Sequence, residues 1–193
     1  SYTLPEHPGA LIYGYERTYA QVIEPLAERN PGLRSFFIGG GGYTFPRYME
    51  ETYPESEIVV AEIDPGVTEI ARVTLGLQGS ERIEAYDEDA RTLMASLEDG
   101  EPYDLIFGDA FNDFSVPYHL TTLEFTQLVD RLLADNGLYV ANIVDGGGRG
   151  SFMRAFVRTQ KAVFEHVAVI PTINSWRSAP RTTWVVVASQ EPL

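Results

Sequence analysis

Four glycines directly after an apolar run are the residues of this chain best suited to holding a ligand. Residues 36–47 read FFIGGGGYTFPR, so that Gly39, Gly40 and Gly41 lie between a predicted strand and a helix with Pro46 in its first turn. Glycine lets the backbone approach a ligand closely, and the N–H groups at a helix start face polar groups. The spacing is not GxGxxG, and a plain turn is the alternative. The position between strand and helix favours a nucleotide-like cofactor.

An acidic residue ends the next strand-like run. Glu62 lies 23 positions beyond Gly39, about where a carboxylate that binds ribose hydroxyls is expected. We therefore predict that Glu62 is a cofactor ligand and that Ile63 belongs to the same site. Asp64 stands before Pro65 and is better explained as the N-cap of the following helix.

A cluster of charged residues follows the third strand-like run. An adenine amino group needs a hydrogen-bond acceptor at this place, and we predict that Asp89 supplies it, with Ala90 beside it in the cofactor site. The alternative role for Asp89 is the N-cap of the helix that begins at Ala90.

The fourth loop, residues 108–122, reads GDAFNDFSVPYHLTT and is the richest in functional groups. Such loops at the carboxyl end of a strand are typical of binding sites. Asp109 ends an apolar strand, so its partly desolvated carboxylate can bind an ammonium group and accept its proton; a structural role in holding loop N–H groups is the alternative. Tyr118 is assigned to the substrate pocket, against the alternative that it packs, and His119 is given no catalytic role.

These residues need a scaffold that brings strand ends together, and the chain supplies alternating strand and helix patterns. We predict a helix from Tyr15 that Pro25 kinks or ends, and then strand 34–38, helix 46–53, strand 57–63, helix 65–75, strand 82–85, helix 90–97, strand 103–108, helix 122–134, strand 138–144 and helix 151–164. Helix 122–134 is expected to open with a capping box from Thr121 to Glu124 and to close at Gly137. This alternation indicates a parallel sheet covered on both faces, with ligands at the carboxyl ends of its strands.

The last two strand-like runs, 167–171 and 182–188, have no helix between them. They predict an antiparallel hairpin at the sheet edge. The fold class expected is therefore α/β, a doubly wound and mostly parallel sheet that ends in an antiparallel hairpin. Residues 1–30 are expected to form an N-terminal arm and helix, and residues 31–193 the ligand-binding domain.

Composition narrows the choice of partners. The chain of 193 residues has a net charge of −14, which repels nucleic acid and anionic lipid and attracts a small cationic substrate. It has no cysteine and three scattered histidines, so no metal site is expected. No apolar run reaches the roughly 20 residues that cross a bilayer. We expect a soluble, cytoplasmic chain without direct membrane contact.

The segments that carry these residues resemble the spermidine synthase family, which has the class I S-adenosylmethionine-dependent methyltransferase fold. The architecture is similar over about residues 33–189, with seven strands implied. The motifs fall in the family's order and spacing: FFIGGGGYTFPRYMEE, VVAEIDPGV, EDAR, YDLIFGDAFND and HLTTLEF. Their amino-acid sequences are most similar to bacterial spermidine-synthase-like domains that stand alone or are joined to membrane segments. In the second case this chain would be the cytosolic part of a larger protein.

The resemblance implies transfer of an aminopropyl group from decarboxylated S-adenosylmethionine to a polyamine-type amine. It assigns Gly39–Gly41 to the cofactor loop, Glu62 to ribose, Asp89 to adenine and Asp109 to the proton acceptor. Glu16 and Tyr19 resemble, less closely, positions of a helix beside the substrate. A homodimer is compatible with the family.

Two departures from the family pattern bear on the reaction. Gly42 replaces an aspartate that holds the donor's amine, and Asn112 replaces one that holds the far amine of the acceptor. Asp113, one residue later, is the candidate to replace the second. Two further hypotheses therefore stay open: methyl transfer from S-adenosylmethionine itself, and a catalytically silent nucleoside-binding domain.

Overall fold

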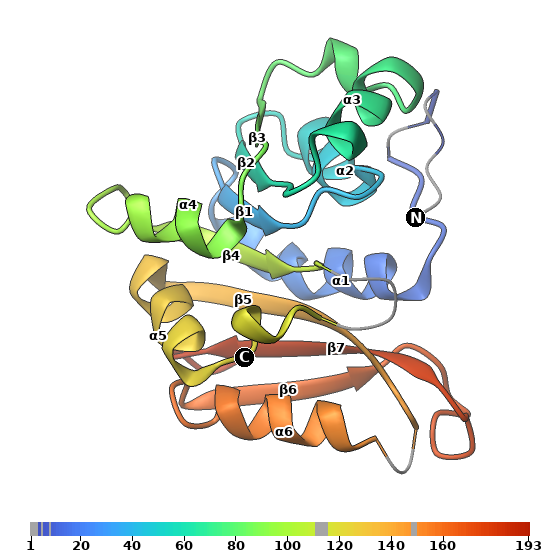
Figure 1. Ribbon diagram of the computed structural model, residues 1–193, viewed down its shortest axis with the longest axis vertical. Helices are drawn as coiled ribbons and strands as arrows, with labels where there is room; N and C mark the ends of the chain where they lie inside the picture. Colours follow the sequence, from blue (N-terminus) through green and yellow to red (C-terminus); the bar gives the residue numbers. More distant parts are fainter. Residues whose placement is uncertain (1–3, 5, 8, 111–115, 148–149) are drawn as a thin grey trace.

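A single seven-stranded sheet organises the chain, in the order β3-β2-β1-β4-β5-β7-β6 (Figure 1). The computed structural model describes residues 4, 6–7, 9–110, 116–147 and 150–193. The strands are β1 (Arg34–Ile38), β2 (Glu57–Ala61), β3 (Ile83–Tyr86), β4 (Tyr103–Gly108), β5 (Leu133–Asp145), β6 (His166–Pro171) and β7 (Thr182–Ser189). The helices are α1 (Gly14–Arg29), α2 (Thr44–Thr52), α3 (Pro65–Thr74), α4 (Ala90–Ser96), α5 (Leu123–Leu132) and α6 (Ser151–Gln160).

The five strands from β1 to β5 pair in parallel, whereas β7 runs antiparallel to both β5 and β6. This arrangement confirms the predicted parallel sheet and terminal hairpin. The strand order reverses between β1 and β4, and ligands of open α/β sheets bind beyond the strand ends at such a reversal.

Two hydrophobic clusters lie on opposite faces of the sheet. Phe37 on β1 packs with side chains from α1, α2 and α3, whereas its neighbour Phe36 packs with those from α4, α5 and α6. Successive strand residues point to opposite faces, so strands that are apolar throughout serve both cores. Each fully buried phenylalanine contributes about 1.5–3 kcal/mol.

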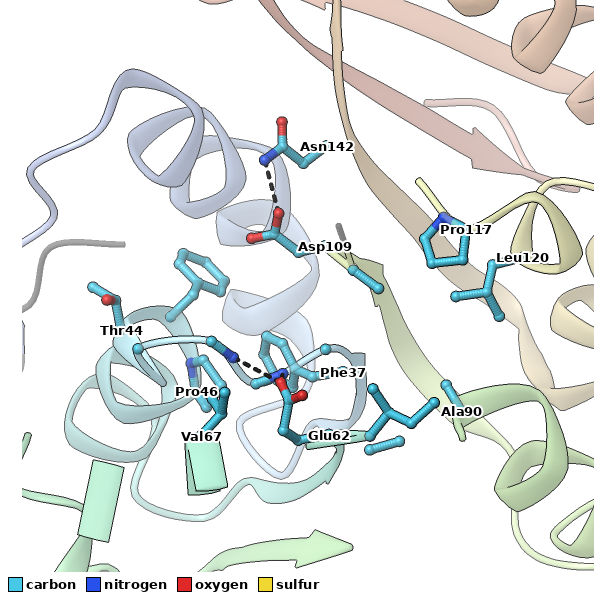
Figure 2. Close-up of a pocket in the computed structure, with 18 of the residues that line it drawn as sticks. Phe37, Thr44, Pro46, Glu62, Val67, Ala90, Asp109, Pro117, Leu120 and Asn142 are labelled. Atoms are coloured by element: carbon cyan, nitrogen blue, oxygen red, sulfur yellow. Dashed lines mark hydrogen bonds between the residues drawn. The ribbon is translucent and has the colours of Figure 1, made fainter. Parts of the chain in front are cut away.

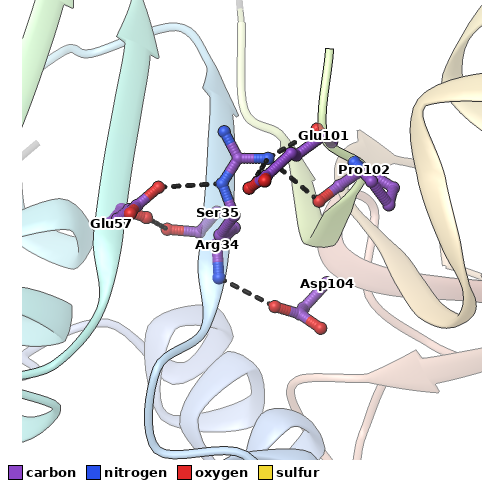
Figure 3. A network of polar contacts seen from close by, with 6 residues as sticks. All are labelled: Arg34, Ser35, Glu57, Glu101, Pro102 and Asp104. Atoms are coloured by element: carbon purple, nitrogen blue, oxygen red, sulfur yellow. Dashed lines mark hydrogen bonds and ion pairs between the residues drawn. The ribbon is translucent and has the colours of Figure 1, made fainter.

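Arg34 holds together the amino-terminal ends of the parallel strands, at the end of the sheet away from the expected ligand site (Figure 3). Its Nε donates to Glu57 Oε2 at 2.8 Å, and one of its terminal nitrogens donates to the carbonyl oxygens of Glu101 and Pro102. The backbone N–H of Arg34 donates to Asp104 at 2.8 Å. Arg34 thus ties the starts of β1, β2 and β4 together, far from the edge where ligands are expected.

Three local predictions were wrong. Helix α1 continues through Pro25 to Arg29, because the buried side chains of Ile23 and Leu26 offset the lost backbone hydrogen bond. The N-cap of α5 is Thr122 and not Thr121 as predicted. The Thr122 hydroxyl accepts a hydrogen bond from the N–H of Phe125.

Gly137 does not end a helix either. Helix α5 stops at Leu132, and β5 begins at the next residue, where Leu133 pairs with Tyr103 before a register shift. A Cβ at Gly137 would lie 2.9 Å from the carbonyl oxygen of Ala134 and 3.0 Å from that of Tyr103. A close backbone approach inside the strand explains this glycine.

None of the helices that the structure describes combines the length and apolar character needed to cross a membrane.

Candidate active site

A cavity of about 550 Å³ opens at the carboxyl ends of β1, β2, β4 and β5 (Figure 2). Gly39, Glu62, Asp109 and Asn142 line it, each from the end of one of these strands. Helix α1 contributes Tyr15, Glu16 and Tyr19 to the lining. The cavity is where the strand order predicted a ligand site.

The glycine loop after β1 requires glycine for both conformation and space. Gly39 has φ 95°, and a Cβ there would lie 3.0 Å from Ala110 Cα and 3.0 Å from the carbonyl oxygen of Asp109. Gly41 also has a positive φ of 51°, and Tyr43, with φ 53°, enters α2 in the left-handed region. The loop therefore presents bare backbone to the cavity. Gly40 and Gly42 line it as well.

Glu62 is buried beneath this loop. Its Oε2 accepts hydrogen bonds from the backbone N–H groups of Gly40 at 2.9 Å and Gly41 at 3.1 Å, and its Oε1 accepts from the N–H of Asp64 at 3.0 Å. The carboxylate is thus fixed in place while facing the cavity, and its unused lone pairs remain available to hydroxyl donors. Asp64 caps α3 as predicted, accepting from the N–H of Gly66.

Asp89 has the N-cap role that was the alternative, and it also lines the cavity, where its contact with adenine stays a prediction. It is the N-cap of α4, where Oδ1 accepts from the N–H of Thr92 at 3.1 Å, and it lines the cavity with Ala90. Its Oδ2 lies 2.8 Å from His119 Nε2. Partial burial works to raise the pKa of Asp89, but the hydrogen bonds from His119 and Thr92 lower it below the ordinary value. A charged acceptor therefore faces the cavity, steadied by His119.

Asp109 lies at the end of β4, and its carboxyl group is the most perturbed acid of the cavity. Oδ1 accepts from Asn142 Nδ2 at 2.7 Å, and the Tyr15 hydroxyl donates a second hydrogen bond. Asp109 is half-buried, and the surface that it keeps lines the cavity. Burial raises its pKa to about 7, with a further contribution from nearby Glu16, against the lowering effect of the two hydrogen bonds.

Helix α1 brings a second buried acid and two tyrosines to the same end of the cavity. Glu16 is 1% exposed, and its Oε2 accepts from the N–H of Tyr13 at 3.1 Å. Burial raises the pKa of Glu16. Burial and the charges of Asp109 and Glu16 also raise the pKa of Tyr15, which keeps its phenol protonated as a donor to Asp109. Tyr19 lines the cavity with Tyr15, so the helix named in the resemblance does lie at the site.

The remaining predicted site residues fall in different places. Ile63 lines the cavity, although 65% of its surface is exposed. Tyr118 is 83% exposed, is absent from the lining and contacts the ring of His119. Asn112 and Asp113 lie outside the described residues. The described histidines and acids form no group of three that could hold a metal.

Two cavity residues were not singled out by the sequence as parts of the site. Asn142 is a lone amide in an apolar stretch of β5, and a polar residue near the carboxyl end of a buried strand could have signalled it. Tyr15 was read only as one position of an amphipathic helix. Nothing in its spacing indicated a contact with Asp109, 94 positions later.

The chain is similar to proteins named as polyamine aminopropyltransferases and to proteins named as methyltransferases. No family model matches the chain. A polyamine aminopropyltransferase of Vibrio vulnificus is 40% identical over 111 residues, which are 56% of this chain and 37% of the relative. A human eEF1A lysine and N-terminal methyltransferase is 28% identical over 154 residues, 75% of this chain and 22% of the relative. The chain thus spans well under half the length of these relatives.

Solved structures share the whole architecture. A probable spermidine synthase from Corynebacterium glutamicum superposes with a TM-score of 0.82 and 29% identity, covering 97% of this chain and 67% of the other. Human Methyltransferase-like protein 13 in complex with SAH gives a TM-score of 0.74 at 23% identity, covering 92% and 83%, and bears on the fold alone.

Proposed function

We propose that this chain, which has a spermidine synthase-like class I methyltransferase fold, is a transferase in which an amine attacks a carbon beside the sulfonium of an S-adenosyl donor. The group transferred is an aminopropyl group from decarboxylated S-adenosylmethionine, and the acceptor is a polyamine-type amine. The observation that carries the proposal is the half-buried carboxyl of Asp109, held by Asn142 at 2.7 Å and with a pKa raised to about 7, in the same cavity as Glu62.

The donor's nucleoside fits the side of the cavity formed by β1, β2 and α4. The glycine loop lines the cavity with Gly39, Gly40 and Gly41, so it offers a ligand bare backbone. Glu62 accepts hydrogen bonds from the ribose hydroxyls, and Asp89 accepts one from the adenine amino group. Ile63 and Ala90 line the cavity beside these acids and cover the faces of the base and sugar.

The acceptor amine fits the end formed by Asp109, Glu16 and the tyrosines of α1. Two buried acids with raised pKa values are stabilised in their charged forms by a cation between them. The net charge of −14 also attracts a cationic substrate at long range. A small amine is therefore the acceptor class.

Proton transfer precedes the substitution. The ammonium group of the acceptor gives one proton to the Asp109 carboxylate, and the freed nitrogen lone pair attacks the carbon bound to sulfur. A nitrogen–carbon bond forms, the carbon–sulfur bond breaks, and its electron pair stays on sulfur as a neutral thioether. The product is a secondary ammonium ion. A base with a pKa near 7 suits this task near neutral pH, and positioning supplies much of the rate.

Methyl transfer is the second candidate function, and Gly42 favours it. At this cavity position the polyamine synthases have an aspartate that holds the donor's amine. Without that acid, S-adenosylmethionine with its carboxylate meets no repulsion at Gly42. The relative named as an eEF1A lysine and N-terminal methyltransferase also points to amine acceptors.

The test is turnover of the purified chain with putrescine and each donor in turn. Formation of methylthioadenosine supports aminopropyl transfer, and formation of S-adenosylhomocysteine supports methyl transfer. In the active pairing, D109N is expected to lose about 100-fold to 10,000-fold in turnover.

A silent nucleoside-binding domain is separated from both enzymes by calorimetry. Tight binding of methylthioadenosine without turnover of either donor would replace the proposed reaction with a binding role. Absence of binding by methylthioadenosine, S-adenosylhomocysteine and both donors would contradict all three functions.

A further inference from the structure

Arg181 stands at the corner where the terminal hairpin meets helix α1. It directly precedes β7, which runs antiparallel beside the end of β5. The start of α1 lies against the same hairpin, because a Cβ at Gly14 would lie 3.4 Å from the carbonyl oxygen of Thr172. The backbone N–H of Thr172 in turn donates to the carbonyl oxygen of Thr183 at 3.2 Å. The residues that precede β7 and the first turn of α1 are therefore neighbours.

The side chain of Arg181 belongs to the mouth of the cavity. Arg181 lines the cavity together with Asn142 and Val144 of β5. Val144 pairs with Thr183, and side chains alternate along a strand, so Arg181 is directed to the same face as Thr183. Arg181 is also exposed, so a ligand that enters from solvent can reach it.

The charge of Arg181 differs from that of its surroundings. Four acids line the cavity, namely Glu16, Glu62, Asp89 and Asp109, whereas Arg181 is the only lysine or arginine among the described lining residues. Glu16 and Asp109 lie at the acceptor end, which Arg181 shares. A diamine suits this arrangement poorly, because its second ammonium would meet a like charge at the mouth. An acceptor with an anionic far end suits it better.

The chemistry of arginine narrows the anionic group to a carboxylate. A guanidinium has five N–H donors in a planar fork that matches a carboxylate, so it can bind a ligand while it keeps contacts within the protein. Phosphate also binds arginine, but the four cavity acids repel a doubly charged group more strongly than a singly charged one.

We propose that Arg181 binds a carboxylate at the far end of the acceptor, so that the acceptor is an aminocarboxylate whose amine reaches Asp109. This inference rests on the proposed amine transfer and narrows its acceptor. Arg181 determines specificity and touches no reacting atom. Putrescine is then a weaker acceptor than an amine of similar length that ends in a carboxylate.

The experiment compares putrescine with 5-aminopentanoate, which has the same number of methylene groups and a carboxylate in place of the second amine. Each is titrated by calorimetry into the wild type, R181Q, R181E and R181K, with and without methylthioadenosine. R177Q is the matched control, since Arg177 is exposed in the same connection, lies 4.4 Å from the centroid of the Trp176 ring and is not among the described lining residues. Unfolding in urea shows whether each variant is folded.

The wild type is expected to bind 5-aminopentanoate about 10-fold more tightly than putrescine. R181Q loses this preference, and R181E reverses it, because a carboxylate at the mouth attracts the second ammonium of putrescine. R181K retains part of the preference, since it keeps the charge without the fork. Added salt weakens the preference of the wild type, as expected for a contact between charges at an exposed site. R177Q follows the wild type.

A wild type that binds putrescine at least as tightly as 5-aminopentanoate, or that binds neither, would overturn the inference. The same holds if folded R181Q and R181E keep the preference of R177Q. Failure of the proposed function gives a different result: neither donor is then turned over with either acceptor, while the ratio of the two dissociation constants still reports on Arg181.

Discussion

Glu62 accepts hydrogen bonds from the backbone of Gly40 through the same carboxylate that faces the cavity, at 2.9 Å. The glycine loop thus fixes the acid at the cavity, where we propose that it binds ribose. E62Q keeps one acceptor oxygen but loses the charge and the second acceptor. We expect it to bind methylthioadenosine about 10-fold to 100-fold more weakly by calorimetry. E69Q, on the exposed face of α3, serves as the control, and equal loss in both variants would contradict a specific role for Glu62.

The close contact between Gly39 and the residues after β4 can be tested by adding a side chain at Gly39. G39A places a methyl group 3.0 Å from Ala110 and Asp109 at a residue with φ 95°, so we expect a loss of about 1–3 kcal/mol in the free energy of unfolding, measured in urea. G79A is the matched control, because a Cβ there meets nothing within 4 Å. If both variants were equally stable, the close approach of the loop to β4 would not hold.

The raised pKa of Asp109 makes the protein's stability depend on pH. The pKa of the Asp109 carboxyl is about 7 in the folded protein and near 3.8 in the unfolded chain, so the folded state binds the carboxyl proton more tightly. The stability that this proton contributes is present at low pH and is lost as the pH rises from about 4 to 7. By linkage, ionised Asp109 lowers the free energy of unfolding by up to about 4 kcal/mol above pH 7.

D109N cannot ionise, and its shape preserves the bond from Asn142. We expect D109N to be more stable than the wild type at about pH 8 and to show a flatter dependence of unfolding free energy on pH. D99N, at an exposed acid, should follow the wild type. Parallel curves for the wild type and D109N would mean that the Asp109 carboxyl is not desolvated.

Much of the fold could be predicted from the sequence, because its signals are local and agree with one another. Leu105, Ile106 and Phe107 form an apolar run in the predicted strand from Tyr103 to Gly108, and the strand has those bounds. The wrong predictions arose where tertiary contacts decide. Burial of Leu26 carries α1 past Pro25, and a close approach to Tyr103 explains Gly137 better than a helix end does.

The site residues also separate into those that local sequence reveals and those that depend on tertiary contacts. Glu62 and Asp89 were found because each acid lies within three residues of the end of a recognisable strand, and both line the cavity. Asn142 was missed because its importance depends on the register between β4 and β5, which only pairing reveals. Tyr15 was missed because its contact with Asp109 joins the start of α1 to the end of β4.

His119 holds Asp89 through a 2.8 Å hydrogen bond at the end of the cavity where we propose that adenine binds. H119A frees the carboxyl to turn and removes a bond that lowers its pKa. We expect the preference for methylthioadenosine over its 6-oxo analogue to fall about 10-fold, because the 6-oxo group cannot donate to Asp89. The measurement is the ratio of two dissociation constants. H7A, at an exposed histidine, is the control, and an unchanged ratio in H119A would remove Asp89 from base selection.

Gly42 is proposed to favour S-adenosylmethionine over its decarboxylated form, and an aspartate introduced at this position tests the proposal directly. Positive φ values in the described chain occur at Gly39, Gly41, Tyr43 and Gly76, so an aspartate at position 42 needs no left-handed backbone. In G42D the new carboxylate attracts the amine shared by both donors but repels the carboxylate that only S-adenosylmethionine carries. We expect the affinity ratio of decarboxylated to intact donor to rise about 10-fold or more, measured by calorimetry. G79D adds the same charge at an exposed turn and should leave the ratio unchanged. A ratio that stays constant in G42D would show that the donor's amine lies away from this loop, and would remove the argument from Gly42 for methyl transfer.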